Sequence, residues 1–549
     1  MKKLLYTSVV ALALVGTGCS SDYLELAPDV NPSPTLLMSS TENAEYAING
    51  LGRLLSNQFL STQGCSGEGG MFLWYGELAG HDMVMPRYNS TWYTYANFTR
   101  MLQSDQTMSA YGWIYNYKMI SNANVIINNI DGAEGLEEDR QYLKAQALVF
   151  RANAYLWLVQ SYSKRWVDSN NGTSRGVVLR KGDDPDDMEC STVAETFQFI
   201  YNDLDEAISL FEASGKDRPS AAEEKWRPNV DVAHAVYARA ALVRNDWTNA
   251  YNHASAVVAK YPQMSTEEYY AGFNAPNKEW IWMLFCDATQ TLSYYPYLAY
   301  AASNANTTVC RTYAPLISKQ LADLIPSDDA RINLYGIPED YEVEKQYINT
   351  TTSPGEVKKG PLFEAYTTEG SKYYDRYDHS LAWTFRAYAV MKFQVASGVG
   401  NGDFVMYRGA EMLYTQAEAL YELGRETEAR NILINAVKPY QPNYSCTLTG
   451  TELRDEIRLY RRFDLLGEGH SWYDWKRWNL PMDRLSWDEG GSWPEVFAGN
   501  GYNNGSGGNY GTSDRNNWCI AIPDEEVNFN AYIKYPLEPS NWTKGYETN

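Results

Sequence analysis

The strongest helical signal in the chain comes from YGWIYNYKMISNANVIINNIDGAEGLEEDRQYLKAQALVFRANAYLWLVQSYS, residues 111–163. Bulky apolar residues recur at helical spacing in its first half, which predicts a helix that ends near Ile130. The Asp-Gly pair and the second glycine in residues 131–135 break this helix. A second helix is expected from Glu137, because acidic residues in a first turn complement the positive end of a helix. The stretch therefore predicts a helical hairpin.

The two helices of this hairpin each carry one face that should be buried. Small alanines alternate with large residues there, so further helices should pack closely on both sides, and the predicted fold is all-α. Asn124 and Arg151 are expected to be hydrogen-bonded structural residues, because buried polar groups are normally paired. The predicted buried residues are Trp113, Tyr117, Ile120 and Ile127 in the first helix, and Leu143, Ala147, Phe150, Ala154 and Leu158 in the second.

Further helices are expected at residues 41–59, 191–213 and 453–478. In the first of these, Thr41 is a suitable N-cap and Glu42 lies in the first turn. Its expected inner face consists of Ala44, Ala47, Ile48, Leu51 and Leu55. Residues 279–285 form a short apolar segment, and the polar residues 336–380 leave room for a few short strands.

Two stretches resemble tetratricopeptide-like helix pairs. Residues 229–262 predict two helices around a turn at 245–247, with Ala238, Ala241, Ala250 and Ala254 at the contact between them. In the second stretch, residues 409–439, Ala429 occupies the place of Ala250 and Gly424 that of the turn. These copies predict a helical-repeat scaffold with long irregular loops.

The N-terminus predicts export. Lys2 and Lys3 precede an apolar run at residues 4–15, which is too short to span a bilayer, and small residues then lead to Cys19. This pattern is typical of a bacterial lipoprotein signal peptide at residues 1–18, with Cys19 lipidated and residues 19–40 forming a leader. The alternative is ordinary signal cleavage beside an incidental cysteine. Two or three acyl chains would tether the protein stably to a membrane.

The charge argues against one class of partner, and the cysteines and histidines bear on disulfides and metal sites. The net charge of −22 over 549 residues argues against nucleic acid, because phosphate binding needs a basic face. Six cysteines remain after Cys19, which permits disulfides in an exported protein without requiring them. No CxxC or HExxH spacing predicts a metal site, and the five histidines show no ligand pattern.

Several strings taken together resemble the SusD/RagB family of outer-membrane lipoproteins. Besides Cys19, they are WIYNYKMISNAN at 113–124, ALVFRANAY at 147–155, YRGAEMLYTQAEA at 407–419, EGHSWYDWKRW at 468–478 and IAIPDEEV at 520–527. The resemblance covers nearly all of the mature chain. One departure is Ser471, where the family motif usually carries Arg, and we expect it to affect local packing.

The resemblance implies a fold and a function. The fold would be a single SusD-like domain at residues 41–549 built on four tetratricopeptide-like pairs, with an N-terminal helical part at 41–335 and a C-terminal part at 336–549. The function would be glycan binding at the outer cell surface, with delivery of oligosaccharides to a TonB-dependent, SusC-like transporter. The family implies neither enzymatic activity nor a cofactor. Part of the family binds peptides, and a pure protein-interaction scaffold is a further alternative.

Two aromatic stretches outside the helical pattern are candidate sugar sites. Sugars stack on Trp and Tyr and bind polar side chains through their hydroxyl groups, so a site needs exposed aromatics with polar neighbours. The family commonly places ligand residues in the first stretch, within residues 64–98. The alternative is that these aromatics are core residues or transporter contacts. The candidates are Asp82, Arg87, Trp92 and Tyr93 from the first stretch, and Tyr294, Tyr295 and Tyr297 from the second.

Enzymatic alternatives have weaker support. Residues 172–176 match GxSxG, but polar residues precede Ser174 where a hydrolase has a buried strand. A glycosidase needs two carboxyl groups about 5 to 9 Å apart. Glu77 with Asp82, or Asp375 with Asp378, are candidates in a chain where acidic residues are common.

Overall fold

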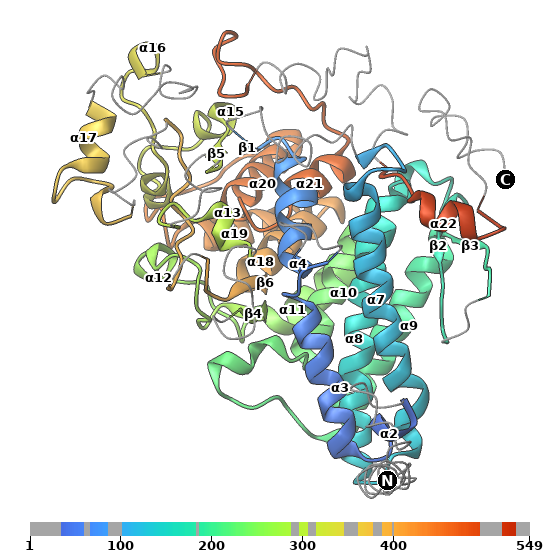
Figure 1. The fold of residues 1–549 in the computed structure, drawn as a ribbon. Coiled ribbons are helices and arrows are strands. Elements are labelled where there is room, and N and C mark those ends of the chain that lie inside the picture. Colours follow the sequence, from blue (N-terminus) through green and yellow to red (C-terminus); the bar gives the residue numbers. More distant parts are fainter. Residues whose placement is uncertain are drawn as a thin grey trace, which may run out of the picture.

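A computed structural model of the chain describes residues 34–59, 66–85, 101–182, 186–286, 296–305, 314–344, 361–376, 387–397, 400–494 and 519–533. Within these ranges helices dominate, and the strands form three separate two-stranded antiparallel sheets (Figure 1). The predicted class, a helical scaffold with a few short strands, is confirmed.

The predicted hairpin is present as α7 (Thr107–Asn129) and α8 (Glu137–Tyr162). α3 (Thr41–Leu54) and α9 (Val193–Ser214) pack against it, and Figure 1 shows these four long helices side by side. All five residues of the predicted α8 stripe are buried, whereas Tyr117 of the α7 stripe is only partly buried. The hairpin thus forms the centre of a helical layer.

Polar contacts fix the ends and the interior of this layer. The N-cap of α3 is Ser40, whose hydroxyl accepts from the Asn43 amide at 3.1 Å, so the prediction of Thr41 was wrong by one residue. Inside the layer, Arg151 donates to Asn124 at 2.8 Å and pairs with Asp203 at 2.7 Å. Asn124 and Arg151 are therefore structural residues, as predicted.

Both predicted repeat pairs are confirmed. The first is α10 (Val230–Arg244) with α11 (Trp247–Val258), and the second is α18 (Gly409–Glu422) with α19 (Glu426–Val437). Ala250 and Ala429 are fully buried at equivalent places. Asn245 and Gly424 have φ angles of 62° and 74° in the two turns. Since α11 packs against α18, the two pairs are neighbours.

Two of the three sheets connect distant parts of the chain. β4 (Trp280–Leu284) pairs with β6 (Phe404–Arg408), so the apolar segment at 279–285 is a buried strand. The other sheets are β1 (Met83–Val84) with β5 (Leu316–Ile317), and β2 (Arg175–Val178) with β3 (Cys190–Thr192). In the described part of 336–380 the structure has short helices and no named strand.

Residues 453–478 differ from the single predicted helix. The structure has α20 (Gly450–Asp464) and α21 (Ser471–Trp478), separated by a turn at residues 465–470. Gly467 and Gly469 adopt φ angles of 83° and 87°, which interrupt the helix and disfavour other residues. A Cβ atom on Gly467 would lie 2.2 Å from the Phe393 ring, so this turn is also tightly packed.

A second difference concerns the first aromatic stretch. Residues 66–85 are described and wholly buried, and they include α4 (Gly67–Gly70) and a π-helix, η2 (Met71–Leu78). The remaining short helices are α2 (Pro34–Leu37), α12 (Thr266–Tyr270), α13 (Leu298–Ala301), α15 (Lys319–Ala322), α16 (Tyr341–Glu344), α17 (Pro361–Thr367), α22 (Asp524–Phe529) and the 3-10 helices η3 (Ile130–Gly132), η4 (Trp166–Asp168), η5 (Ala222–Trp226), η6 (Ala330–Leu334) and η9 (Tyr374–Arg376).

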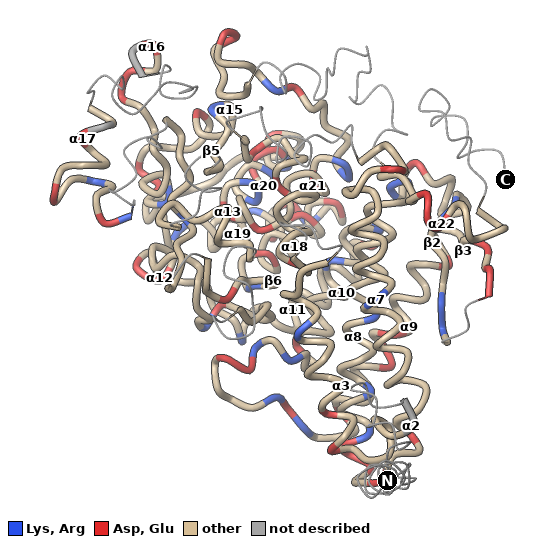
Figure 2. The backbone as a smooth tube through the Cα atoms, in the orientation of Figure 1, with Lys and Arg blue, Asp and Glu red and all other residues tan. Residues whose placement is uncertain are grey.

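One large hydrophobic cluster runs from Met38 to Ile533 and includes residues of both halves of the chain. A smaller cluster lies between α18, α19 and α20. Lys and Arg are interspersed with Asp and Glu along the backbone (Figure 2). Among the described residues, no helix is long and apolar enough to cross a membrane. Cys19 lies outside the described residues, and Cys190, Cys286, Cys446 and Cys519 are free thiols.

Candidate functional site

The first predicted loop follows β1 in the sequence. Met83 and Val84 pair with Ile317 and Leu316 of β5, and the described segment ends one residue later, at Met85. Arg87, Trp92 and Tyr93 follow in sequence and lie outside the described residues. The structure therefore describes the segment that precedes this loop, residues 66–85, and the residues that contact it.

Glu77 holds the helix before β1 against the turn at residues 465–470. The amides of Gly469 and His470 donate to its Oε1 atom at 2.7 and 2.9 Å. Burial raises the pKa of Glu77 to about 7, although these backbone donors oppose the rise. The carboxyl group is fully buried, so it acts as a structural acceptor.

The backbone between Glu77 and β1 is bound on both sides by the C-terminal part of the chain. Arg484 donates to the carbonyl oxygens of Ala79, at 2.9 Å, and of Gly80. The amides of His81 and Asp82 donate to the Ser471 hydroxyl at 3.2 and 3.3 Å. Backbone groups of residues 79–82 are thus hydrogen-bonded to Arg484 and Ser471.

Asp82 is a buried ion-pair residue. It is 1% exposed, and Arg462 donates to both of its carboxylate oxygens, at 3.0 and 2.7 Å. Burial disfavours its charge, but Arg462 and a hydrogen bond from His81 hold the pKa of the Asp82 carboxyl well below its usual range. A sugar-binding role for Asp82 would require an exposed carboxylate, but the carboxylate of Asp82 is buried, so the expected exposure of this residue is wrong.

Tyr297 is likewise a core residue. It is 2% exposed, its hydroxyl donates to the Gly467 carbonyl, and its ring stacks on Phe404 with centroids 4.0 Å apart. The exposure expected of Tyr297 is therefore wrong too, because strand β6 and the 465–470 turn enclose the ring. Tyr294 and Tyr295 precede it and lie outside the described residues.

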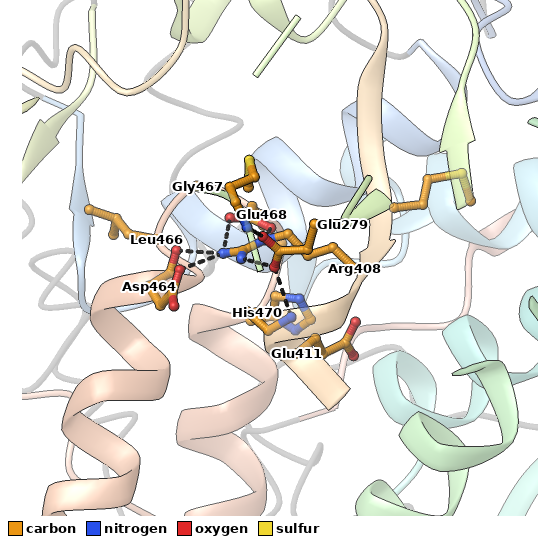
Figure 3. Close-up of polar contacts among 12 residues, drawn as sticks. Glu279, Arg408, Glu411, Asp464, Leu466, Gly467, Glu468 and His470 are labelled. Atoms are coloured by element: carbon orange, nitrogen blue, oxygen red, sulfur yellow. Dashed lines mark hydrogen bonds and ion pairs between the residues drawn. The ribbon is translucent and has the colours of Figure 1, made fainter. Parts of the chain in front are cut away.

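The 465–470 turn, which supports both loop ends, rests on a buried charged cluster. Arg408 donates to Glu279, Asp464 and Glu468 at 2.7 Å each, and Figure 3 shows its guanidinium among these carboxylates. Lys392 donates to Glu468 at 2.5 Å and to the Leu466 carbonyl at 2.9 Å. Burial lowers the pKa of Lys392, and Glu468 opposes this shift.

Each charged side chain in these ion pairs faces one of opposite charge, and each is only 0 to 4% exposed. A buried ion pair of this kind fixes geometry, because removing one member leaves an unpaired buried charge. No role was predicted for Arg408, Asp464 and Glu468. Arg408 and Glu468 belong to the strings at 407–419 and 468–478 that carry the family resemblance, whereas Asp464 lies outside both strings.

The enzymatic alternatives find no geometric support in the described residues. Ser174 directly precedes β2, so no buried strand leads into it, and its hydroxyl has no hydrogen-bond partner there. Glu77 and Asp82 are both buried and engaged, and Asp378 lies outside the described residues. No group of three His, Cys, Asp or Glu residues that could hold a metal ion occurs in the described ranges.

Comparison with known proteins gives two family matches. A model described as "SusD family" matches residues 245–542, which is more than half of the chain. A model described as "Starch-binding associating with outer membrane" matches residues 75–242.

Two SusD-like proteins of Formosa agariphila are also similar. One is 30% identical over 117 residues, which is 18% of this chain and 23% of that protein, and the other is 26% identical over 278 residues, 48% of each. The chain thus matches less than half the length of these relatives.

Solved structures share the fold over most of the chain. A SusD-like carbohydrate binding protein from Bacteroides vulgatus superposes with a TM-score of 0.68 at 22% identity, covering 90% of this chain and 97% of that one. A SusD superfamily protein from Bacteroides thetaiotaomicron gives 0.67 at 20% identity, covering 90% and 99%. These likenesses establish the architecture of helix pairs and loops.

Proposed function

Because this chain belongs to the SusD family, we propose that it is a cell-surface lipoprotein that binds glycans and delivers oligosaccharides to a TonB-dependent, SusC-like transporter. The observation that carries the proposal is the family match over residues 245–542. SusD proteins bind and do not transform their targets, so the chain is not an enzyme.

The geometry of the loop support agrees with a binding role. Glycan recognition depends on aromatic side chains held in fixed positions, since ordering a loop during binding reduces affinity. Here the segments that precede Arg87 and follow Tyr295 are both hydrogen-bonded to the 464–471 region. We therefore assign glycan contact to Arg87, Trp92, Tyr93, Tyr294 and Tyr295.

Lipid anchoring on Cys19 and delivery to a transporter complete the proposal. A family model that matches residues 75–242 is described as associating with the outer membrane, which supports this location. A tethered binding protein without catalytic groups needs a second protein to take up its cargo. The partner expected from the family is a TonB-dependent barrel.

Affinity electrophoresis tests the binding step. The mature chain is run in gels that contain starch, xylan, pectin, laminarin or a mannan, and a peptide pool is tested by calorimetry. Retardation by one or more of the polysaccharides, without heat from the peptides, is the expected result. Binding to peptides alone would replace glycan by peptide as the cargo, and binding to neither class would contradict the proposal.

Copurification tests the delivery step. The tagged chain is isolated from its own cells in mild detergent, and a large outer-membrane barrel protein should accompany it. A soluble Cys19→Ala form mixed with the same membranes serves as the comparison, since it retains the docking surfaces without the anchor. Repeated recovery of the chain alone would remove the transporter from the proposal and leave glycan binding unaffected.

A further inference from the structure

Two histidines face each other across the first repeat pair. His234 lies on α10 and His253 on α11, and their Nδ1 atoms are 2.9 Å apart, within hydrogen-bond distance. The 5.1 Å between the ring centroids exceeds the distance between the nitrogens by about the width of one ring, so each Nδ1 atom points toward the other. Both side chains are half-buried. The two helices are therefore joined by a well-aligned bond between two titratable groups.

Aromatic stacking holds the His253 ring in place. Tyr237 of α10 lies on this ring, with centroids 3.7 Å apart and planes 6° apart. Tyr237 stacks in turn on Tyr201 of α9, with centroids 4.5 Å apart. The Tyr201 hydroxyl donates to Asp246, the N-cap of α11, at 3.3 Å. The stack thus links three helices and ends at the histidine pair.

The bond between the two Nδ1 atoms depends on how many protons the pair carries. In the neutral pair one ring donates its Nδ1–H group, and the other accepts with its Nδ1 lone pair. A first added proton can bind the outer Nε2 atom of the donor ring, which keeps the hydrogen bond. A second would have to bind the accepting Nδ1 atom, which removes the acceptor and brings two like charges together.

The surroundings of the pair oppose its protonation. Burial, together with the charge of His234, lowers the pKa of His253 from 6.5 to about 4. Burial also lowers the pKa of His234. The nearby charged groups that act on the two rings or on Tyr237 are Asp231 of α10, Asp246 at the start of α11, Lys260 after its end, and Asp205 and Glu212 of α9.

Three further elements, α8, α18 and β4, also pack on α10 or α11. The sequence of β4 has no charged residue. Buried charged groups of the two helices are engaged in ion pairs, which are Arg151–Asp203 for α8, and Glu411–Arg239 and Glu418–Arg477 for α18. These carboxylates are thus neutralised by arginines.

We propose that His234 and His253 form an acid-sensitive lock between the two helices of the first repeat pair. The pair holds α10 to α11 while it carries at most one added proton, and the second added proton breaks the bond. Because the unfolded chain binds these protons more readily than the native state, the stabilising contribution is complete above about pH 6.5. It is lost as the pH falls toward about 4. The lock does not depend on glycan binding.

A double-mutant cycle in the full mature chain tests the lock. Urea denaturation of wild type, His234→Ala, His253→Ala and the double variant gives the coupling between the two rings. At about pH 7.5 the coupling should lower the unfolding equilibrium constant about fivefold, equivalent to about 1 kcal/mol. At about pH 4.5 it should disappear or change sign, since the unfolded chain then binds two protons and the native pair only one.

The bond between Gln416 and Ser255 provides the matched control. The Gln416 Nε2 atom donates to the Ser255 hydroxyl at 2.7 Å, which joins α18 to the same helix α11 without a titratable group. The coupling from Gln416→Ala and Ser255→Ala should be equal at both pH values. For the histidines, equal favourable coupling at both pH values would overturn the acid sensitivity. Absence of coupling at both would overturn the pairing.

Nuclear magnetic resonance of histidine-labelled protein gives a second readout that does not require unfolding. His253 should titrate well below pH 6.5 in wild type, and His234→Ala should raise its pKa toward 6.5, because the neighbouring charge and part of the burial are removed. A His253 that titrates near pH 6.5 in wild type, or does not respond to His234→Ala, would contradict the lock.

Discussion

At the scale of single residues, buried carboxyl groups do most to hold the candidate site together. Glu77 accepts two backbone amides of the 465–470 turn, and Glu468 joins the same turn to Arg408 and Lys392. Both groups are shielded from solvent, so the hydrogen-bond and ion-pair partners of each determine whether it stabilises the fold.

Glu77→Gln should remove a pH dependence of stability. The pKa of Glu77 rises from 4.5 to about 7 on folding, so the native state holds this proton more tightly than the unfolded chain. The stabilising contribution is complete below pH 4.5 and is lost as the pH rises through about 7. Between pH 4.5 and about 7, the free energy of unfolding of wild type should fall by up to roughly 3 kcal/mol relative to that of Glu77→Gln.

Urea denaturation at a series of pH values between about 4 and 8 measures this difference. Glu452→Gln, at an exposed position in the first turn of α20, is the control and should follow wild type. Parallel pH profiles for wild type and Glu77→Gln would show that Glu77 does not take up a proton in the native state.

Arg408→Met should be among the most destabilising single changes. It leaves Glu279, Asp464 and Glu468 without their shared cation in a region closed to water, which costs about 3 to 5 kcal/mol. Arg425→Met breaks an ion pair with Glu428 that is 40% and 53% exposed, so it should have little effect on stability. Equal shifts of the denaturation midpoint in both variants would contradict a structural role for the cluster.

At the scale of helices and strands, periodic segments could be predicted and irregular ones could not. α8 begins at Glu137 as expected, because the acidic first turn and the long apolar stripe both favour a helix here. The break between α20 and α21 was missed, since the apolar spacing continues across Gly467 and Gly469. The π-helix η2 was missed because it is buried on every side and has no helical stripe.

The repeat pairs predict matched responses to overpacking. Ala250 and Ala429 are both fully buried at helix contacts, so Ala250→Leu and Ala429→Leu should each destabilise by about 1 to 3 kcal/mol. Thr248→Leu places the same side chain on the exposed face of α11 and should have little effect. Thermal denaturation compares the three. A neutral Ala429→Leu would show that the second pair packs differently from the first.

At the scale of the whole molecule, the helical scaffold could be predicted from the sequence, but the burial of two candidate site residues could not. Asp82 and Tyr297 lie beside the predicted loops, but one pairs with Arg462 and the other packs on Phe404. Arg462 is separated from Asp82 by 380 residues, and no local pattern in one sequence reports such a contact. Composition identifies an aromatic loop, whereas burial depends on partners that only the tertiary fold supplies.

The proposed anchor predicts a change of compartment without a change of fold. Cys19→Ala removes the proposed acylation site and with it the proposed membrane tether. The variant should therefore appear in the soluble fraction after cell lysis, with wild-type thermal stability. Intact Cys19→Ala protein that remained in the membrane fraction would disprove lipid anchoring at this residue.

The central claim is that this scaffold presents aromatic loops to a glycan. Isothermal titration with the polysaccharide that retards the protein most strongly tests it in Trp92→Ala, Tyr295→Ala and the control Tyr46→Ala, which alters an exposed tyrosine on α3. Trp92→Ala and Tyr295→Ala should each lose about 1 to 3 kcal/mol of binding free energy and keep wild-type thermal stability. Tyr46→Ala should bind as wild type does. Wild-type affinity in folded Trp92→Ala and Tyr295→Ala proteins would contradict the account.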